Sequence, residues 1–400
     1  MKKAVIKNNK KFSTIEVLIL VMLTLMLSFG AGFILNQKEN KEKIKEDKYL
    51  EIFKENYDHI IESYYEDIDK NKLIENAIKG MVESLGDEYS AYMDGSESDT
   101  FDKTLNGSYQ GVGVTIAKDE KENIVIIDIF KDSPADNADL KVMDIIKKVN
   151  DKEIKNMEPS DVTALIKKTS NKEFTLTVSR DGKEITKKIK TSLVTIKSVE
   201  YKLIEEDNKK IGYVSIGLFA LNTGTQFKEA IKELEKSNID SLIIDVRDNA
   251  GGHLVTAKEI SSSLLDSKKV IYQTQGKDKK EKTYSTGKET KKYPIIFLAN
   301  ENTASGSEVL IGAVKDNIKE TIIVGEKTYG KGTVQELTEL NNNSQYKVTT
   351  KKWLTPNGTW IHKKGIKPDV EIKLSEEFMK NPKTENDNQL KKAMEKAKGN

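Results

Sequence analysis

The chain has 400 residues, and its 66 lysines and arginines nearly balance its 64 aspartates and glutamates. The formal net charge of +2 argues against a dedicated nucleic-acid binder. There is no cysteine, which excludes disulfides and thiolate chemistry, and the three histidines (His59, His253 and His362) show no metal-ligand spacing, so neither a metal nor another cofactor is expected.

The N-terminal segment is typical of a membrane anchor. Residues 1–12 carry five lysines and no acidic residue, and residues 17–35 are apolar apart from Thr24 and Ser28. As a helix this run would reach roughly 28 Å, enough to cross a bilayer core. The preceding lysines then place the N-terminus in the cytoplasm and the bulk of the chain outside. Residues 1–37 are therefore predicted to be a cytoplasmic N-terminus with a single-pass anchor. A cleaved signal peptide is the alternative, but the run is long and no A-x-A site follows.

Residues 38–98 are predicted to be helical. Their first part, residues 38–48, is charged and typical of a solvated stalk. Two amphipathic stripes follow, at Tyr57, Ile60, Ile61 and Tyr64 and at Leu73, Ala77, Met81 and Leu85. A plain helical linker and a helical segment that packs on the rest of the protein both stay open.

Residues 99–190 are predicted to form a small β domain with one helix at 159–168; the expected strands are 111–116, 124–129, 144–149 and 174–179. Gly111, Val112, Gly113 and Val114 resemble the carboxylate-binding loop of a PDZ domain. The resemblance implies that this loop binds the C-terminus of a peptide, which adds to the sheet as a strand. An ordinary glycine turn is the alternative. Arg180 either ties this domain to the next or is a surface residue.

The pattern of residues 191–375 indicates an α/β domain. Apolar runs at 212–219 and 241–246 flank a helical pattern at 226–237, which predicts a β–α–β unit with parallel strands. Asp245 to Gly252 follows the second run, and α/β proteins bind ligands at the carboxyl ends of such strands. The charged residues 268–292 are expected to form a loop or hairpin, and residues 376–400 a charged helical tail.

Ser305 has two interpretations. It stands between an apolar strand at 295–299 and a helical pattern, where Glu308 completes a capping box. A serine on a strand-to-helix turn can also be a nucleophile, with the amide of Gly306 helping to bind an oxyanion. Its base would be Lys331, because Ser–Lys pairs are a variant of the catalytic triad. If residues 330–337 form a strand, Gln335 projects from the same face as Lys331 and can orient the amine. His253 offers a Ser–His alternative.

TASGSE, followed by GEKTYGKGTVQ, resembles the carboxy-terminal processing proteases, S41 serine peptidases with a Ser–Lys dyad; DVRDNAGG, LTPNG and KGIKPDV resemble segments of the same family. The resemblance covers residues 50–375. It implies a helical segment and a PDZ domain before an α/β core of the ClpP/crotonase-like kind. It also implies that Ser305 is the nucleophile, Lys331 the general base and Gln335 its orienting partner, with oxyanion-hole amides from Gly252 and Gly306. The family often has proline at position 250 and alanine at 306, and a backbone donor survives both changes.

The sequence therefore predicts a membrane-anchored serine endopeptidase on the extracytoplasmic side of the cell membrane. It would process or degrade proteins, with a role in signal transduction, and recognise apolar C-termini through the PDZ domain. The helical segment would support a homodimer or shape the substrate tunnel. Two rival functions are a non-enzymatic PDZ scaffold on a decayed protease core and a crotonase-type acyl-CoA enzyme. The intact Ser305, Lys331 and Gln335 argue against the scaffold, and an acyl-CoA enzyme has no need of a PDZ domain.

Overall fold

The computed structural model describes residues 48–169, 172–340 and 343–399. The chain divides into two compact units, residues 1–81 and 82–400. Residues 48–63 are helical, and α2 runs over Lys70–Glu83, so the helix predicted over 38–98 is confirmed in these two ranges. It is wrong at residues 91–93, which form a strand that pairs with residues 345–347. The predicted anchor at 17–35 lies outside the described residues. Of the helices in the described ranges, none combines the length and apolar character needed to cross a bilayer.

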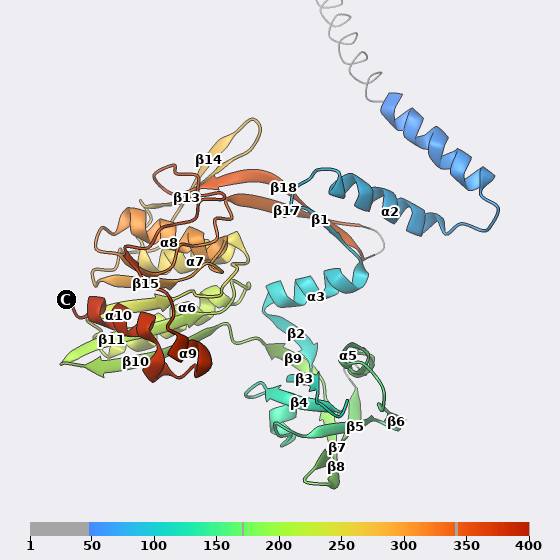
Figure 1. Cartoon of the computed structure of the whole chain (residues 1–400), viewed down its shortest axis with the longest axis horizontal. Helices are drawn as coiled ribbons and strands as arrows, with labels where there is room; N and C mark the ends of the chain where they lie inside the picture. The colour runs from blue at the N-terminus through green and yellow to red at the C-terminus, as the bar shows by residue number, and fades with distance from the viewer. Residues whose placement is uncertain (1–47, 170–171, 341–342, 400) are drawn as a thin grey trace, which may run out of the picture. The chain divides into compact units, whose positions relative to one another are not determined.

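A six-stranded sheet forms the centre of the α/β domain (Figure 1). Its order is β10-β11-β12-β15-β16-β19, and only the β10–β11 pair is antiparallel. The predicted β–α–β unit is confirmed, because α6 connects the parallel strands β11 and β12. The strands run over Val199–Glu206 (β10), Lys209–Ile216 (β11), Ser241–Asp245 (β12), Ile295–Ala299 (β15), Ile322–Gly325 (β16) and Val370–Glu371 (β19).

Helices cover both faces of this sheet (Figure 1). Because successive side chains of a strand point to opposite faces, Leu242 and Ile244 belong to one core and Ile243 to the other. The first core contains α6 (Thr223–Lys236), α7 (Leu254–Leu264) and α8 (Gly306–Asn317), and the second contains α10 (Asn388–Ala397).

The C-terminal segment is part of this core rather than a free tail. A short helix α9 (Glu376–Lys380) and a 3-10 turn (Thr384–Asn386) lead from β19 into α10. Leu390, Ala393 and Ala397 are buried against the sheet with Ile243. These three residues recur at helical spacing and form a narrow apolar stripe, which the charged composition of the segment did not predict.

A second, antiparallel sheet carries the segment after Lys331. Its strands are β1 (Ala91–Met93), β13 (Val270–Gln275), β14 (Lys280–Tyr284), β17 (Thr333–Glu339) and β18 (Gln345–Leu354). β13 and β14 form the hairpin expected at 268–292. The strand predicted at 330–337 begins only at Thr333, and its pairing with β18 shifts register between Val334 and Gln335. The prediction that Lys331 and Gln335 share a strand face is therefore wrong, because Lys331 lies in the preceding loop.

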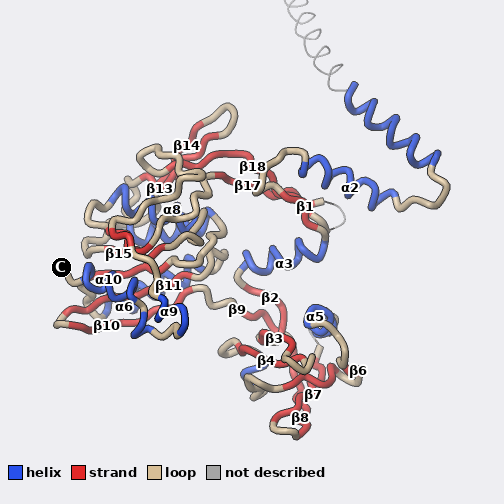
Figure 2. Tube along the Cα trace, in the orientation of Figure 1, coloured by secondary structure: helices blue, strands red, loops and turns tan. Residues whose placement is uncertain are grey.

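The predicted β domain has its own sheet and core (Figure 2). One long helix, α5 (Pro159–Lys167), packs on it, and Gly113 (φ 83°) interrupts the strand expected at 111–116. The predicted domain start at residue 99 falls inside α3 (Gly95–Asn106). The remaining elements are β2 (Ser108–Gly111), β3 (Val114–Lys118), β4 (Ile124–Ile129), α4 (Pro134–Asn137), β5 (Ile145–Val149), β6 (Lys152–Glu153), β7 (Glu173–Arg180), β8 (Lys183–Lys190) and β9 (Ser192–Thr195).

Arg180 binds within this domain. Its guanidinium donates to both carboxylate oxygens of the buried Asp144, at 2.7 and 2.8 Å, and to the carbonyl of Asp139 at 2.8 Å. This bidentate pair joins the last residue of β7 to the residue that precedes β5. The recorded contacts of Arg180 thus lie within its own domain, and the hypothesis that it ties the domain to its neighbour stays a prediction.

Candidate active site

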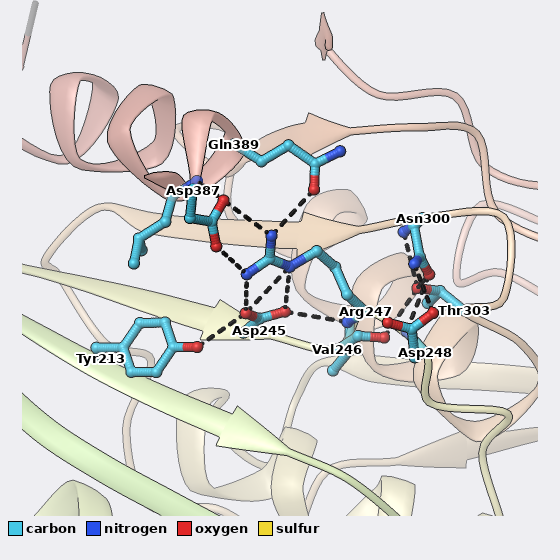
Figure 3. Close-up of polar contacts among 10 residues, drawn as sticks. Tyr213, Asp245, Val246, Arg247, Asp248, Asn300, Thr303, Asp387 and Gln389 are labelled. Carbon is cyan, nitrogen blue, oxygen red and sulfur yellow. Dashed lines mark hydrogen bonds and ion pairs between the residues drawn. The ribbon is translucent and has the colours of Figure 1, made fainter. Parts of the chain in front are cut away.

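Two loops at the carboxyl ends of neighbouring parallel strands meet at the site (Figure 3). The amide of Asp248, after β12, donates to Asn300 Oδ1 at 2.9 Å, and Asn300 Nδ2 donates back to Asp248 Oδ1 at 2.8 Å. Thr303 Oγ1 donates to the carbonyl of Val246 at 2.8 Å. These bonds fix the loop with the paired glycines beside the turn that carries Ser305.

Arg247 connects the first loop to the C-terminal helix (Figure 3). Its Nη2 donates to Asp245 at 2.6 Å and to Asp387 at 2.8 Å, and its Nη1 donates to Gln389 at 3.1 Å. The hydroxyl of Tyr213 donates to Asp245 at 2.8 Å. Burial opposes the charge of Arg247, but the two carboxylates outweigh burial and raise its pKa. An arginine only 11% exposed, between two buried carboxylates, thus holds the start of the loop that leads to Gly252.

Ser305 occupies a strained turn between β15 and α8. Its backbone has φ 52° and ψ −114°, whereas a helix N-cap usually has an extended backbone. Ser305 is half-buried, and every other residue from Thr303 to Val314 is buried. A sharp strand-to-helix turn that exposes one serine is the geometry of a nucleophile.

The amides of Gly252 and Gly306 are neighbours beside Ser305. A Cβ added to Gly306 would lie 3.5 Å from the nitrogen of Gly252, and one added to Gly251 only 2.6 Å from the nitrogen of Gly306. Such close approach, with a φ of 96° at Gly251, requires glycine there. Within the described ranges neither amide donates to an acceptor of the protein. Two adjacent, unused N–H groups next to a serine are suited to binding an oxyanion.

Glu308 is fully buried, and it binds the backbones of both predicted catalytic residues. Its Oε2 accepts from the amides of Ser305 and Lys331, both at 2.9 Å. Its Oε1 accepts from Thr328 Oγ1 at 2.5 Å and from the amide of Gly330 at 2.8 Å. Burial raises the pKa of Glu308, and these hydrogen bonds oppose that shift. The predicted contact from Glu308 back to Ser305 is confirmed, and the contacts to the Lys331 loop are new.

Lys331 is half-buried and lines the same cavity as Ser305. Its carbonyl accepts a hydrogen bond from Trp353 Nε1 at 2.7 Å, and its Nζ lies 4.8 Å from the centre of the Tyr89 ring. Burial lowers the pKa of Lys331, and the charge of Lys347 lowers it further. A lowered pKa increases the neutral fraction of the amine, which is the form that a general base requires.

Gln335 lines the cavity but binds two threonines. Its Nε2 donates to Thr333 Oγ1 at 3.0 Å and to Thr349 Oγ1 at 2.9 Å. In the part of the chain that the structure describes, no hydrogen bond joins Gln335 to Lys331. An orienting role for Gln335 stays a prediction, and it would use the amide oxygen.

The cavity has a volume of about 480 Å³ and apolar walls that the sequence did not predict. Phe101 and Leu105 of α3 contribute to them, together with Leu337 of β17. His253 also lines the cavity, but its Nε2 is buried without a hydrogen-bond partner among the described residues, and burial lowers its pKa. The Ser–His alternative therefore lacks the contact that it requires.

The glycine loop of the β domain borders a second, smaller cavity of about 50 Å³. Gly111, Val112 and Val114 line it together with Ile166 of α5. The carbonyl of Val112 accepts from the amide of Ala135 at 2.8 Å, which fixes the loop to α4. A groove between a strand and a helix, closed by a glycine loop, is where a peptide can add to a sheet as a further strand.

Comparison with known families assigns three parts of the chain. Residues 31–97 match the N-terminal domain of the activating protease CtpB, residues 110–191 a PDZ domain, and residues 210–372 peptidase family S41. A solved structure of a putative S41 protease from Bacteroides fragilis has the same fold, with a TM-score of 0.51 at 15% identity over 84% of this chain and 98% of the other.

Two relatives extend over most of the chain. The carboxy-terminal processing protease CtpB of Bacillus subtilis is 34% identical over 84% of this chain and 70% of its own length. The carboxy-terminal processing protease CtpA of the same organism is 36% identical over 88% of this chain and 74% of its own length. The chain therefore belongs to the carboxy-terminal processing proteases, S41 serine peptidases that carry a PDZ domain.

Proposed function

We propose that Ser305 is the nucleophile of this protease and Lys331 its general base. The shared cavity carries the proposal, because Ser305, Lys331 and Gly252 line one space of about 480 Å³. The unused amides of Gly252 and Gly306 support it, since they offer two donors to a developing negative charge. Glu308 supports it further, because one carboxylate fixes the backbones of both reacting residues.

In the first step, neutral Lys331 Nζ takes the proton of Ser305 Oγ while Oγ bonds to the scissile carbonyl carbon. The carbonyl oxygen becomes an anion that the amides of Gly252 and Gly306 stabilise. The Lys331 ammonium then returns its proton to the departing amine as the C–N bond breaks. Water hydrolyses the acyl-enzyme by the same proton route, and Gln335 orients the amine through its amide oxygen.

The PDZ domain of this protease binds peptide C-termini, and we extend this to apolar C-termini. Val112, Val114, Ile116 and Ile166 line the groove, so an apolar terminal side chain would be buried there. Free and C-terminally amidated peptides of one sequence, titrated into the Ser305→Ala protein, test the carboxylate contact. Equal affinities would contradict it.

We further propose a single-pass membrane protein whose catalytic part faces outside the cytoplasmic membrane, where its cleavages contribute to signal transduction. The lysine-rich, then apolar sequence of residues 1–37 supports this location. Exposed apolar side chains on the helix at residues 48–63, including Tyr49, Leu50 and Phe53, support a homodimer. Fractionation of cells with and without residues 1–37, and protease digestion of intact cells, test the anchor and its orientation.

The catalytic assignment is tested with an unfolded protein substrate such as β-casein. Ser305→Ala and Lys331→Met should abolish cleavage, because each removes a group that takes part in the chemical step. Lys327→Met, an exposed lysine in the same loop, is the matched control and should cleave normally. Cleavage by Ser305→Ala at the wild-type rate would overturn the assignment, and no cleavage by the wild type would favour the scaffold.

A further inference from the structure

An aromatic ring lies against the amine of Lys331. Lys331 Nζ is 4.8 Å from the centre of the half-buried Tyr89 ring, within the distance at which an ammonium and a π face attract each other. No carboxylate among the described residues lies within ion-pair distance of this amine. Gln335, its predicted partner, donates instead to Thr333 and Thr349. The Tyr89 ring is thus a group that the structure places against Nζ.

Tyr89 is held in place by the sheet that also carries Gln335. It precedes β1, which pairs with β18 from Ala91 to Met93. The neighbouring Ser90 Oγ donates to Asp87 and accepts from the amide of Thr349 at 3.1 Å, so the turn at 87–90 is fixed to β18. The ring of His362 packs against Tyr89 with centroids 6.0 Å apart. The position of the ring is therefore set by both backbone and side-chain contacts.

We propose that the face of Tyr89 stabilises the positive charge that Lys331 acquires when it removes the proton of Ser305, which makes Tyr89 a positioning residue for the base. This inference rests on the proposed roles of Ser305 and Lys331. In a Ser–His–Asp triad a carboxylate stabilises the charged base. Here the proton moves from Ser305 Oγ to Lys331 Nζ as the Oγ–C bond forms, and the π face accommodates the new ammonium until it protonates the leaving amine.

Charged groups on several elements also face Lys331, and their effects differ in sign. Lys347 on β18 disfavours the ammonium, whereas Asp87 and Glu88 beside Tyr89, and Glu308 on α8, favour it. His362 and Tyr329 adjoin Tyr89 itself. Removing the π face should therefore lower the pKa of Lys331, and removing the charge of Lys347 should raise it.

The test is the pH profile of kcat/KM for a peptide substrate, measured with the full-length protein. Tyr89→Leu keeps the approximate size but removes the ring. The acidic limb of the profile, where kcat/KM rises as Lys331 loses its proton, should move to lower pH by about half to one unit. The plateau value of kcat/KM should fall about three- to tenfold, because the amine becomes a weaker base. Tyr89→Phe keeps the π face and should keep the wild-type limb. Lys347→Gln should move the limb to higher pH.

A shape-neutral variant guards against misfolding of Tyr89→Leu. Replacing Tyr89 by 3,4,5-trifluorophenylalanine keeps the ring but withdraws its electron density, and the limb should move in the same direction as in Tyr89→Leu. A limb that stays at the wild-type pH in both variants, with only a uniform loss of rate, would overturn the proposal and leave Tyr89 a packing residue. Unchanged cleavage by Ser305→Ala would instead overturn the catalytic assignment itself.

Discussion

Glu308 offers the sharpest test of how the site is assembled. Glu308→Gln keeps the side-chain volume but replaces one acceptor oxygen by an NH₂ group. Four donors converge on the carboxylate, two on each oxygen, and three of them are backbone amides. The Thr328 hydroxyl can rotate and accept from an NH₂ group, but whichever way the Gln amide turns, at least one backbone N–H meets another donor. A hydrogen bond to a charged acceptor contributes about 1.5–3 kcal/mol, so the loss of one such bond should lower the free energy of unfolding by about that amount. That is a large part of the roughly 5–15 kcal/mol typical of a folded domain.

Activity should fall more than stability alone explains, because the released amides belong to Ser305 and Lys331. A displacement of about 1 Å at such a site can cost about 100-fold in rate. Denaturant unfolding gives the stability, and labelling of Ser305 by a fluorophosphonate gives nucleophile reactivity below the unfolding transition. Glu301→Gln, an exposed glutamate in the turn before Ser305, is the matched control and should change stability by less than about 0.5 kcal/mol. If Glu308→Gln behaved like this control in both measurements, the carboxylate would not hold the site together.

Three further results are expected. Folding lowers the pKa of Lys331, so the unfolded chain binds more protons at neutral pH and the charge of Lys331 costs stability there. Lys331→Met should therefore melt at or above the wild-type temperature at pH 7. The difference in melting temperature should narrow as the pH rises toward the ordinary lysine pKa of 10.5. Easier unfolding of Lys331→Met at pH 7 would show that this lysine is structural. Arg247→Met leaves two buried carboxylates without their cation and should destabilise the protein by about 3–5 kcal/mol in denaturant titration; a loss below about 1 kcal/mol would show that the network contributes little. Arg180→Met should destabilise the PDZ domain and so lower its affinity for a peptide, while the sites at which casein is cleaved stay the same. Altered cleavage sites would point to a role of Arg180 outside its own domain.

The features that the sequence predicted correctly are local. An apolar run predicts the strand at 295–299, and a capping pattern followed by apolar residues at helical spacing predicts the turn at Ser305 and the helix after it. The parallel β11–β12 pair follows from alternation of strand and helix. Gln335 shows the limit of local pattern, because β17 begins three residues later than predicted and Lys331 lies outside the strand, although both side chains line the same cavity.

The contacts that assemble the site join residues far apart in the chain, and no periodicity reports them. The sequence predicts Glu308 to be part of a helix cap, but its carboxylate also accepts hydrogen bonds from the amides of Gly330 and Lys331. The sequence predicts Tyr89 only as part of a helical segment, but its ring lies against the amine of Lys331. Both depend on how separate elements pack, which composition and spacing do not encode.

The link from Arg247 to the C-terminal helix has a consequence for the order in which the protein loses structure. α10 is a ten-residue helix, and Asp387 at its start is bound by the arginine that begins the loop to Gly252. Partial opening that detaches α10 would leave Arg247 with Asp245 alone and release the loop that carries Gly252 while most of the sheet persists. On gentle heating, peptidase activity should thus disappear before the far-ultraviolet dichroism changes, and the C-terminal helix would act as a thermal limit on catalysis.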